Sequence, residues 1–259
     1  MGAVEAHAAG TFCWVELGTT DQNAAKQFYG SLFGWTANDF PMGPDEVYTM
    51  FGLEGRNTGA CYTLRPDMRE HGVPPHWLLY VSVANADETA AKIAPAGGKV
   101  VAPPFDVAEF GRMAVLQDPT GATIAIWQPK MHHGTGIEGV PGTLCWADLM
   151  TPDQAAAAKF YQGVFGWQAD PGKENTGYLH IKNGDKHIGG IPPAAYQNPN
   201  APPHWLLYFL VEHCDALTAK AKANGANIYM APMNMEGVGR WSVVADPQGA
   251  VFALFQPAR

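Results

Sequence analysis

Seven consecutive residues occur twice in this chain without a change: residues 74–80, PPHWLLY, return as residues 202–208. The similarity extends beyond that heptad, because TFCW at residues 11–14 returns as TLCW at residues 143–146, and F-Y-x-x-x-F-G-W at residues 28–35 returns at residues 160–167. Two copies are too few, and the period is too long, for a solenoid. The sequence therefore predicts two domains of ordinary length.

The expected boundaries follow from the repeat. We expect an N-terminal tail at residues 1–10, a first domain at 11–129, a linker at 130–142 and a second domain at 143–259. The linker holds four glycines, one proline and the pair His132-His133, a composition typical of a connecting segment. Successive side chains of an extended chain point apart, so the histidine pair is expected to be solvated and not to chelate one metal.

Composition narrows the classes of partner. The chain has 16 basic and 24 acidic residues, a formal charge of −8 and no cluster of Lys or Arg, which disfavours nucleic acid and anionic membranes. Its four cysteines form no C-x-x-C motif and are expected to be reduced, with Cys13 and Cys145 in the core. No secretory signal and no long apolar run occurs, which predicts a cytoplasmic protein. Since two copies are already fused, we expect a monomer or a weak homodimer.

The first element of each copy is expected to be a strand. Residues 11–17 alternate, with Phe12, Trp14 and Glu16 on one face and Cys13 on the other. A helix should follow, beginning at a capping box, Thr19-x-x-Gln22 or Thr151-x-x-Gln154 with Pro152 in the first turn, and ending at Gly34 or Gly166.

The rest of the first copy predicts further extended segments and one more helix. Strands are expected at residues 46–53, 57–64, 77–83, 99–102, 112–117 and 122–128, with a helix at 87–94. D-P-x-G turns at residues 118–121 and 246–249 precede the last strand of each copy. Each copy thus holds two β-α-β-β-β modules, four in the whole chain.

This order of elements, with its F-Y-x-x-x-F-G-W, G-G and D-P-x-G motifs, resembles the vicinal oxygen chelate superfamily. That superfamily contains glyoxalase I, extradiol dioxygenases and bleomycin-binding proteins, and the chain looks most like its tandem actinobacterial glyoxalase-like members. The resemblance implies an α+β fold in which the four modules form two glyoxalase-like domains. Each would be a curved mixed sheet forming a U-shaped cup, with helices outside and a ligand or metal on the concave face.

The resemblance also indicates where metal ligands would lie. Metal-dependent members use three strand positions, which fall here on Trp14, Leu78 and Ala125, and in the second copy on Trp146, Leu206 and Ala253. None of these side chains binds a divalent metal. We therefore expect neither metal nor cofactor. A site displaced by two residues, onto Glu16 and His76 or onto Asp148 and His204, remains the alternative.

A cup without metal would present aromatic and ionisable groups. The expected lining is Trp14, Glu16, His76 and Tyr80 in one copy and Trp146, Asp148, His204 and Tyr208 in the other. An indole beside a carboxylate suits a small planar or hydrophobic ligand. The carboxylates Glu16 and Asp148 are candidate bases, and the imidazoles His76 and His204 are candidate acids.

Each of these residues also has a structural interpretation. His76 and His204 follow Pro-Pro, so an imidazole that only bonds the loop backbone fits equally well. Arg112 and Arg240 are candidate ligand-binding residues or plain ion-pair partners of the strand carboxylates. His180 and His187 have no histidine counterparts in the first copy, and a difference between the cups is expected there.

Three functions stay open. The first is binding or sequestration of a small aromatic or carbonyl-containing molecule. The second is metal-independent acid–base conversion of the lyase, isomerase or hydrolase type. The third is metal-dependent glyoxalase or dioxygenase chemistry with displaced ligands. One scaffold hosts all three, so the fold does not choose between them.

Overall fold

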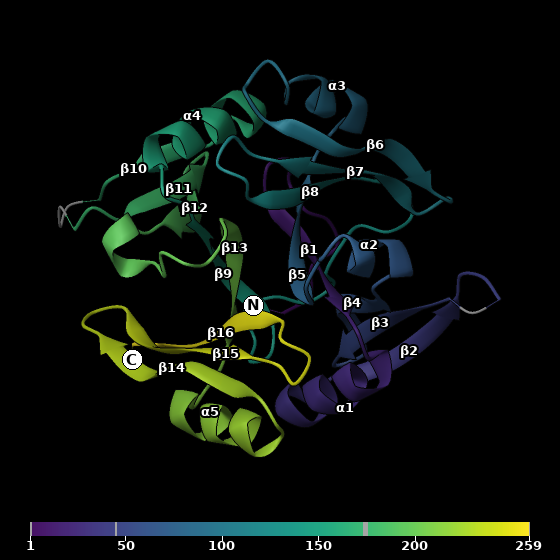
Figure 1. Cartoon of the computed structure of the whole chain (residues 1–259), viewed down its shortest axis with the longest axis vertical. Coiled ribbons are helices and arrows are strands. Elements are labelled where there is room, and N and C mark those ends of the chain that lie inside the picture. The colour runs from purple at the N-terminus through teal and green to yellow at the C-terminus, as the bar shows by residue number, and fades with distance from the viewer. Residues whose placement is uncertain (1, 45, 173–175, 259) are drawn as a thin grey trace.

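A computed structural model of the chain describes residues 2–44, 46–172 and 176–258. Each copy forms one mixed sheet of eight strands, and the two sheets have the same order of strands, β2-β3-β4-β1-β5-β8-β7-β6 and β10-β11-β12-β9-β13-β16-β15-β14. In Figure 1 each sheet is curved, and the central strands of both lie in the middle of the molecule. The expected α+β fold with two cup-shaped glyoxalase-like domains is confirmed.

The described residues of the first copy form eight strands and three helices. In chain order they are β1 (Phe12–Thr19), α1 (Gln22–Phe33), β2 (Thr36–Pro41), β3 (Val47–Leu53), β4 (Arg56–Thr63), α2 (Pro66–Glu70), β5 (His76–Ser82), α3 (Ala86–Ala91), β6 (Lys99–Val107), β7 (Gly111–Gln117) and β8 (Thr123–Pro129). The short β2 and α2 were not expected from the sequence, and β6 runs five residues beyond its expected end.

The second copy repeats this order with one difference after its fourth strand. Its elements are β9 (Leu144–Met150), α4 (Gln154–Phe165), β10 (Gln168–Asp170), β11 (Leu179–Asn183), β12 (Lys186–Ile191), η1 (Ala194–Tyr196), β13 (His204–Leu210), α5 (Cys214–Ala223), β14 (Asn227–Met235), β15 (Gly239–Ala245) and β16 (Val251–Pro257). A short 3-10 helix, η1, takes the place of α2. No helix of the described residues is long and apolar enough to cross a membrane.

The long helices begin differently from the expected capping boxes. The N-caps are Asp21 and Asp153, whose carboxylates accept from the backbone N–H groups of Ala24 and Ala156. An aspartate three residues before a free N–H is a strong cap by itself, so the threonine is not needed there. The expected ends are correct, because Gly34 and Gly166 adopt the left-handed conformation with φ of 75°.

The strict alternation expected for the first strand is interrupted. The register of β1 on β5 shifts between Phe12 and Trp14, so Cys13 and Trp14 both face the cup and Phe12 turns to the opposite face. The second copy shifts at the same place, between Tyr208 and Phe209 of β13. A bulge adds one residue and reverses the side-chain parity beyond it, which explains the difference.

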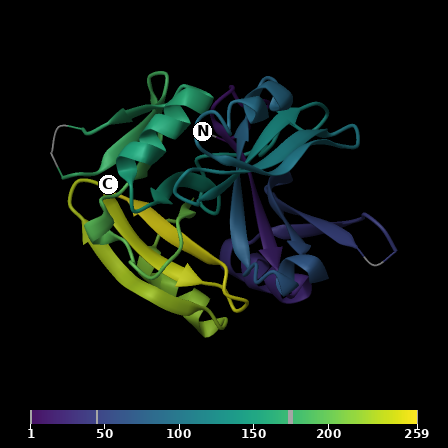
Figure 2. The same cartoon turned by 45° about the horizontal axis from the view of Figure 1, so that its top comes forward.

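The convex faces of the two sheets share one core. A single cluster of buried residues contains Trp77 and Trp205, and with them Tyr29 and Phe209, so residues of both copies pack together. Helix α1 contacts α5, and both views show this pair together, with α3 and α4 near each other at the opposite end (Figures 1 and 2). The aromatic residues of α1 and α4 lie in this core with Trp77 and Trp205.

The linker is packed against the first copy. Gly134, Thr135 and Ile137 are buried, and the N-terminal tail pairs with the linker through an isolated bridge between Ala3 and Ile137. The composition of the linker had suggested that His132 is solvated. Its ring instead lies against Trp14, with 4.5 Å between the ring centroids. His133 is exposed, as expected.

Candidate functional site

The concave face of each sheet carries a carboxyl group, that of Glu16 half-buried and that of Asp148 buried. In the first copy Glu16 accepts a hydrogen bond from the Tyr80 hydroxyl at 2.7 Å, and Tyr48 also bonds to it. The Trp14 indole donates to the Tyr48 hydroxyl at 3.3 Å. Trp14, Glu16 and Tyr80 therefore meet in one cup, as the sequence predicted, and Tyr48 joins them from β3.

The second copy holds its carboxyl group with more donors. Asp148 is 6% exposed, and its Oδ1 accepts from the Tyr178 hydroxyl at 2.5 Å and the Trp146 indole at 3.0 Å. The Tyr208 hydroxyl donates to Oδ2 at 2.8 Å. Three of the approximately four lone-pair positions of the carboxylate are thus used, and one on Oδ2 stays available.

Burial has the largest effect on the pKa of both carboxyl groups, and it raises both values. It raises the pKa of the Asp148 carboxyl above its ordinary value, although the hydrogen bonds from Tyr178, Tyr208 and Trp146 act in the opposite direction. Burial likewise raises the pKa of Glu16, against the bonds from Tyr48 and Tyr80. A carboxyl group whose proton is held more tightly than in water is suited to acid–base exchange with a bound molecule.

The two strand histidines lie away from the carboxylates. The register places His76 opposite Gly18, whereas Glu16 lies opposite Leu78, and the second copy repeats this with His204 opposite Met150. Nδ1 of His76 bonds the Pro74 carbonyl at 2.8 Å, and His204 bonds the carbonyl two residues before it at the same distance. The described residues show no hydrogen bond between either histidine and a cup carboxylate. Their geometry agrees with the structural interpretation.

The arginines bind carboxylates outside the cups. Arg112 donates from Nε and Nη2 to the two oxygens of Asp87, at 2.7 and 2.9 Å. Arg240 binds Asp215 through the same two atoms. Each pair joins a strand to the first turn of a helix, so the arginines hold α3 and α5 on their sheets. The expected pairing with Glu16 and Asp148 is absent from the described part of the chain.

Three residues of the first cup were missed by the sequence analysis. Tyr48 was assigned to a strand without a role, Trp127 was not singled out, and His132 was placed in solvent. The repeat itself contained a signal for the first of these, because Tyr48 corresponds to Tyr178 and both contact the cup carboxyl group. His132 had no local signal in the sequence, because the position of a linker residue depends on which strands the linker packs against.

The positions implied for metal ligands do converge, but their side chains do not fit a metal. Trp14, Leu78 and Ala125 belong to one buried cluster in the first cup, and Leu206 and Ala253 share a cluster with Trp146 in the second. Indole, isobutyl and methyl groups offer no electron pair to a divalent ion. Residues 2–44, 46–172 and 176–258 contain no group of three or more His, Cys, Asp or Glu side chains placed to hold one.

Comparison with known proteins agrees with this architecture. The model of the Glyoxalase/Bleomycin resistance protein/Dioxygenase superfamily matches residues 11–126 and again residues 143–254. The chain belongs to this superfamily. Its sequence is also similar, over almost its whole length, to those of the two proteins described next.

The Mycobacterium tuberculosis (strain CDC 1551 / Oshkosh) protein named "Putative glyoxylase CFP32" is 41% identical over 254 residues, which cover 96% of this chain and 95% of that protein. The "Anthracycline biosynthesis protein DnrV" of Streptomyces peucetius is 32% identical over 263 residues, with 96% and 94% covered. Each of these alignments spans both repeats of this glyoxalase-superfamily chain.

Solved structures of the superfamily share the fold at low identity. The 2,3-dioxygenase LapB from Pseudomonas sp. KL28 matches with a TM-score of 0.66 and 16% identity, covering 98% of this chain and 94% of that one. The Mn(II)-bound glyoxalase from Novosphingobium aromaticivorans matches with a TM-score of 0.65 and 17% identity, covering 99% and 83%. At such identities the likeness concerns the fold alone.

Proposed function

We propose that this protein binds a planar aromatic molecule that carries carbonyl and hydroxyl groups, in a cup that needs no metal. The observation that carries the proposal is the environment of Asp148, a buried carboxyl group that accepts from two tyrosine hydroxyls and one indole. Aromatic walls supply apolar contact area for a flat ligand, and the few polar groups orient it.

The polar groups select the substituents of the ligand. The Tyr208 hydroxyl keeps its lone pairs, and the Tyr178 hydroxyl keeps one beside the bond that it accepts from the Trp146 indole at 2.9 Å. Oδ2 of Asp148 also keeps one, so a ligand hydroxyl finds acceptors there. Tyr80 and Glu16 present the same pair of groups in the first cup. The name of the relative DnrV, an anthracycline biosynthesis protein, supports a polycyclic aromatic ligand of this kind.

Conversion of the ligand is a second candidate function, favoured by the raised pKa of Asp148. A buried carboxyl group with a raised pKa exchanges a proton with a carbon acid or enol next to a carbonyl, which is the step of a lyase or isomerase. In this scheme the ligand proton goes to Oδ2, and the tyrosine hydroxyls hold the carboxyl group in place. No redox step and no added reactant is needed.

Fluorescence titration tests the binding proposal. The probe is 1,8-dihydroxyanthraquinone, and its binding is followed by the quenching of the indoles that line the cups. We expect saturable quenching, and about 10-fold weaker binding in Asp148→Asn, because the amide replaces an acceptor by a donor facing hydroxyl donors. Absence of saturable quenching would refute the proposal.

Turnover separates the two candidates. If Asp148 exchanges protons, the protein will catalyse hydrogen–deuterium exchange or isomerisation of a bound carbonyl compound, and Asp148→Asn will abolish this while Asp215→Asn, on the surface, will not. Metal analysis by mass spectrometry accompanies both assays. Near-stoichiometric iron, zinc, manganese or nickel that survives dialysis would contradict a cup that needs no metal. It would favour a metal site on the displaced ligands.

A further inference from the structure

The two cups are not equally open, because the linker covers one end of the first. The backbone N–H of Thr135 donates to the Cys13 carbonyl, and that of Gly136 donates to the Asn57 carbonyl, both at 2.8 Å. An extended piece of the linker therefore lies across the beginnings of β1 and β4.

The side chain of His132 completes this cover. Its ring is edge-on to Trp14, with centroids 4.5 Å apart, and lies 5.8 Å from the ring of Trp127. The Trp127 indole donates to the His132 carbonyl at 2.8 Å. Trp14 and Trp127 are only 4% and 6% exposed as a result.

The matching strands of the second copy can be identified from the register. Glu16 lies opposite Ala60 in the first sheet, and Asp148 lies opposite Gly190 in the second. The beginning of β4, residues 56–58, therefore corresponds to the beginning of β12, residues 186–188. Cys13 and Trp14 correspond in the same way to the residues at 145 and 146 of β9.

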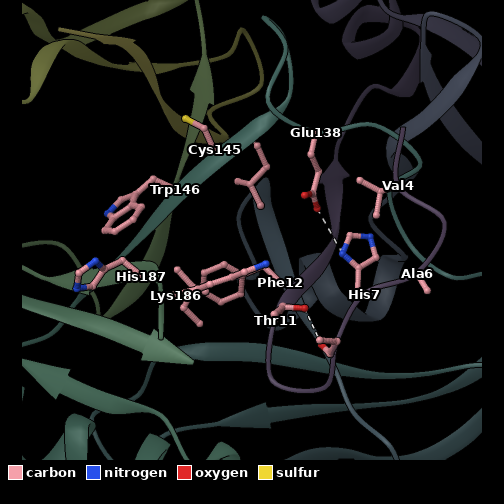
Figure 3. Close-up of a pocket in the computed structure, with 13 residues that line it drawn as sticks. Val4, Ala6, His7, Thr11, Phe12, Glu138, Cys145, Trp146, Lys186 and His187 are labelled. Carbon is pink, nitrogen blue, oxygen red and sulfur yellow. Dashed lines mark hydrogen bonds and ion pairs between the residues drawn. The ribbon is translucent and has the colours of Figure 1, made fainter. Parts of the chain in front are cut away.

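A cavity of about 380 Å³ lies at this place in the second copy. Its walls include the counterparts of the covered residues, namely Cys145, Trp146, Lys186, His187 and Ile188. The N-terminal tail and the start of β1 form the other side, and Figure 3 shows Trp146 and His187 facing the His7–Glu138 pair across the space. What the linker fills in the first copy is thus open in the second.

Trp146 connects this cavity to the carboxyl group of the second cup. Its ring lines the cavity, while its Nε1 donates to Asp148 at 3.0 Å. Trp146 and Cys145 are half-buried, whereas Cys13 is 1% exposed. A molecule in the cavity therefore reaches the indole that contacts the candidate acid–base group.

The second cup also contains a hydrogen-bond donor without a partner. Nε1 of Trp241 is buried and bonds to nothing in the described residues, although its ring lies 5.6 Å from that of Tyr208. The first copy has Met113 at the same place, after the same Gly-Arg pair. An unpaired buried N–H is unfavourable, but Trp241 lies outside the residues that line the cavity and is not part of the site.

The charges around the cavity favour a ligand with an anionic group near one corner. Lys186 lines the cavity, and no carboxylate of the described residues lies within ion-pair distance of it. Glu138 is engaged by His7 at 3.4 Å, and His187 lies 3.8 Å from Asp170. Among the described residues that line the cavity, Lys186 is therefore the cation left for a ligand.

We propose that the chain has one ligand site, in the second repeat, where an aromatic carbonyl compound with a carboxylate binds between Trp146 and Lys186. The first repeat keeps the same floor but closes it with its own linker and serves as a structural partner. A volume of about 380 Å³ lies in the range of small-molecule sites. This inference rests on the proposed function and adds which repeat binds and which groups of the ligand are recognised.

Equilibrium dialysis with two probes tests the inference. The probes are 1,8-dihydroxyanthraquinone and its 3-carboxylate, which differ only in the anionic group. We expect one equivalent of each per chain. Lys186→Met should weaken the carboxylate probe about 10-fold and leave the neutral probe unchanged, since one ion pair at a partly desolvated site is lost.

The repeat supplies matched controls. Arg56→Met, at the corresponding exposed place of the first copy, should change neither probe. Trp241→Phe and Met113→Leu, at positions outside the lining of the cavity, should weaken neither probe. All four variants should keep the far-ultraviolet circular dichroism of the parent chain.

The outcomes separate the two proposals. Two equal sites per chain, or equal effects of Arg56→Met and Lys186→Met, would overturn the assignment to the second repeat and leave binding in the cups intact. A Lys186→Met variant that binds the carboxylate probe like the parent would overturn the role of this cation. If neither probe binds, the proposed function fails, and this inference fails with it.

Discussion

The hydroxyl group of Tyr29 donates to Oδ2 of Asp246 at 2.9 Å, across 217 residues of sequence. The symmetric bond joins Tyr161 to Asp118 at 3.1 Å, so each copy sends a helix tyrosine to the D-P-x-G turn of the other. In each turn the other carboxylate oxygen accepts backbone N–H groups, which fixes the turn itself. One aspartate thus forms a turn and joins two repeats.

Removing one of these hydroxyl groups should destabilise the whole chain. Tyr29→Phe leaves Oδ2 of Asp246 and the indole N–H of Trp77, which donates to the Tyr29 hydroxyl at 3.1 Å, without their partner in the core. We expect a loss of about 1–3 kcal/mol in the free energy of unfolding, measured by urea denaturation. Tyr196→Phe, at a side chain 77% exposed, is the control and should change stability by less than about 0.5 kcal/mol. Equal effects of the two variants would contradict the inter-repeat role.

The duplication made much of the fold predictable. Motifs such as Gly34 and the D-P-x-G turns have one local conformation that suits them, and the structure shows it. The faces of β1 were harder, because a bulge at Phe12 leaves no mark in an alternating pattern. An alternating sequence pattern shows which face of the sheet each side chain lies on only where the strand pairing is regular.

The candidate site was predictable only in part, for the same kind of reason. Trp14, Glu16 and Tyr80 lie on neighbouring strands whose pairing the repeat suggests, and they do meet. Tyr48 reaches Glu16 from a strand two places away, and His132 reaches Trp14 from the linker. Contacts of this kind depend on how the sheet curves and on where a connecting segment crosses it.

The buried imidazole of His132 should make the protein sensitive to acid. Burial and the nearby His133 and His7 lower the pKa of His132 from 6.5 to about 4. The folded pKa is below the unfolded value, so this group contributes stability that is complete above pH 6.5 and is lost as the pH falls toward 4. His132→Phe keeps an aromatic ring against Trp14 but does not titrate.

Comparison of the parent with His132→Phe isolates the effect of protonating His132. Relative to His132→Phe, the parent should lose about 2 kcal/mol of unfolding free energy between pH 7 and pH 4.5, as followed by urea denaturation at both values. His133→Phe, at an exposed position, should show no such difference. A parent and a His132→Phe variant with parallel pH profiles would show that the imidazole is solvated.

The carboxyl group of Asp148 should act on stability in the opposite sense. Its folded pKa is raised by burial, so protonation is more favourable in the folded than in the unfolded chain. The contribution is therefore complete below the unfolded pKa of about 4 and declines as the pH rises through the folded pKa. Relative to Asp148→Asn, the parent should lose stability as the pH increases from 4 to 7.

Infrared spectroscopy gives an independent measurement of the same group. The protonated carboxyl band of Asp148, identified by its absence in Asp148→Asn, should persist at a pH above the ordinary range of aspartate. Asp215→Asn is the control, because the Arg240 ion pair holds the pKa of Asp215 below its usual value. A band that disappears at the pH where exposed aspartates ionise would refute the raised pKa.

The arginines distinguish a ligand role from a structural one. Arg112 and Arg240 bind Asp87 and Asp215 at the first turns of α3 and α5, outside the cups. Arg112→Met and Arg240→Met should therefore leave the affinity for 1,8-dihydroxyanthraquinone within about twofold of the parent, a difference under about 0.5 kcal/mol.

The two substitutions should instead loosen the helix that each arginine holds on its sheet. Amide hydrogen exchange should become faster in α3 for the first variant and in α5 for the second, because local opening of a helix follows the loss of its contacts. An affinity that falls 10-fold or more, with exchange in α3 and α5 unchanged, would place the guanidinium groups at the ligand and not at the helix.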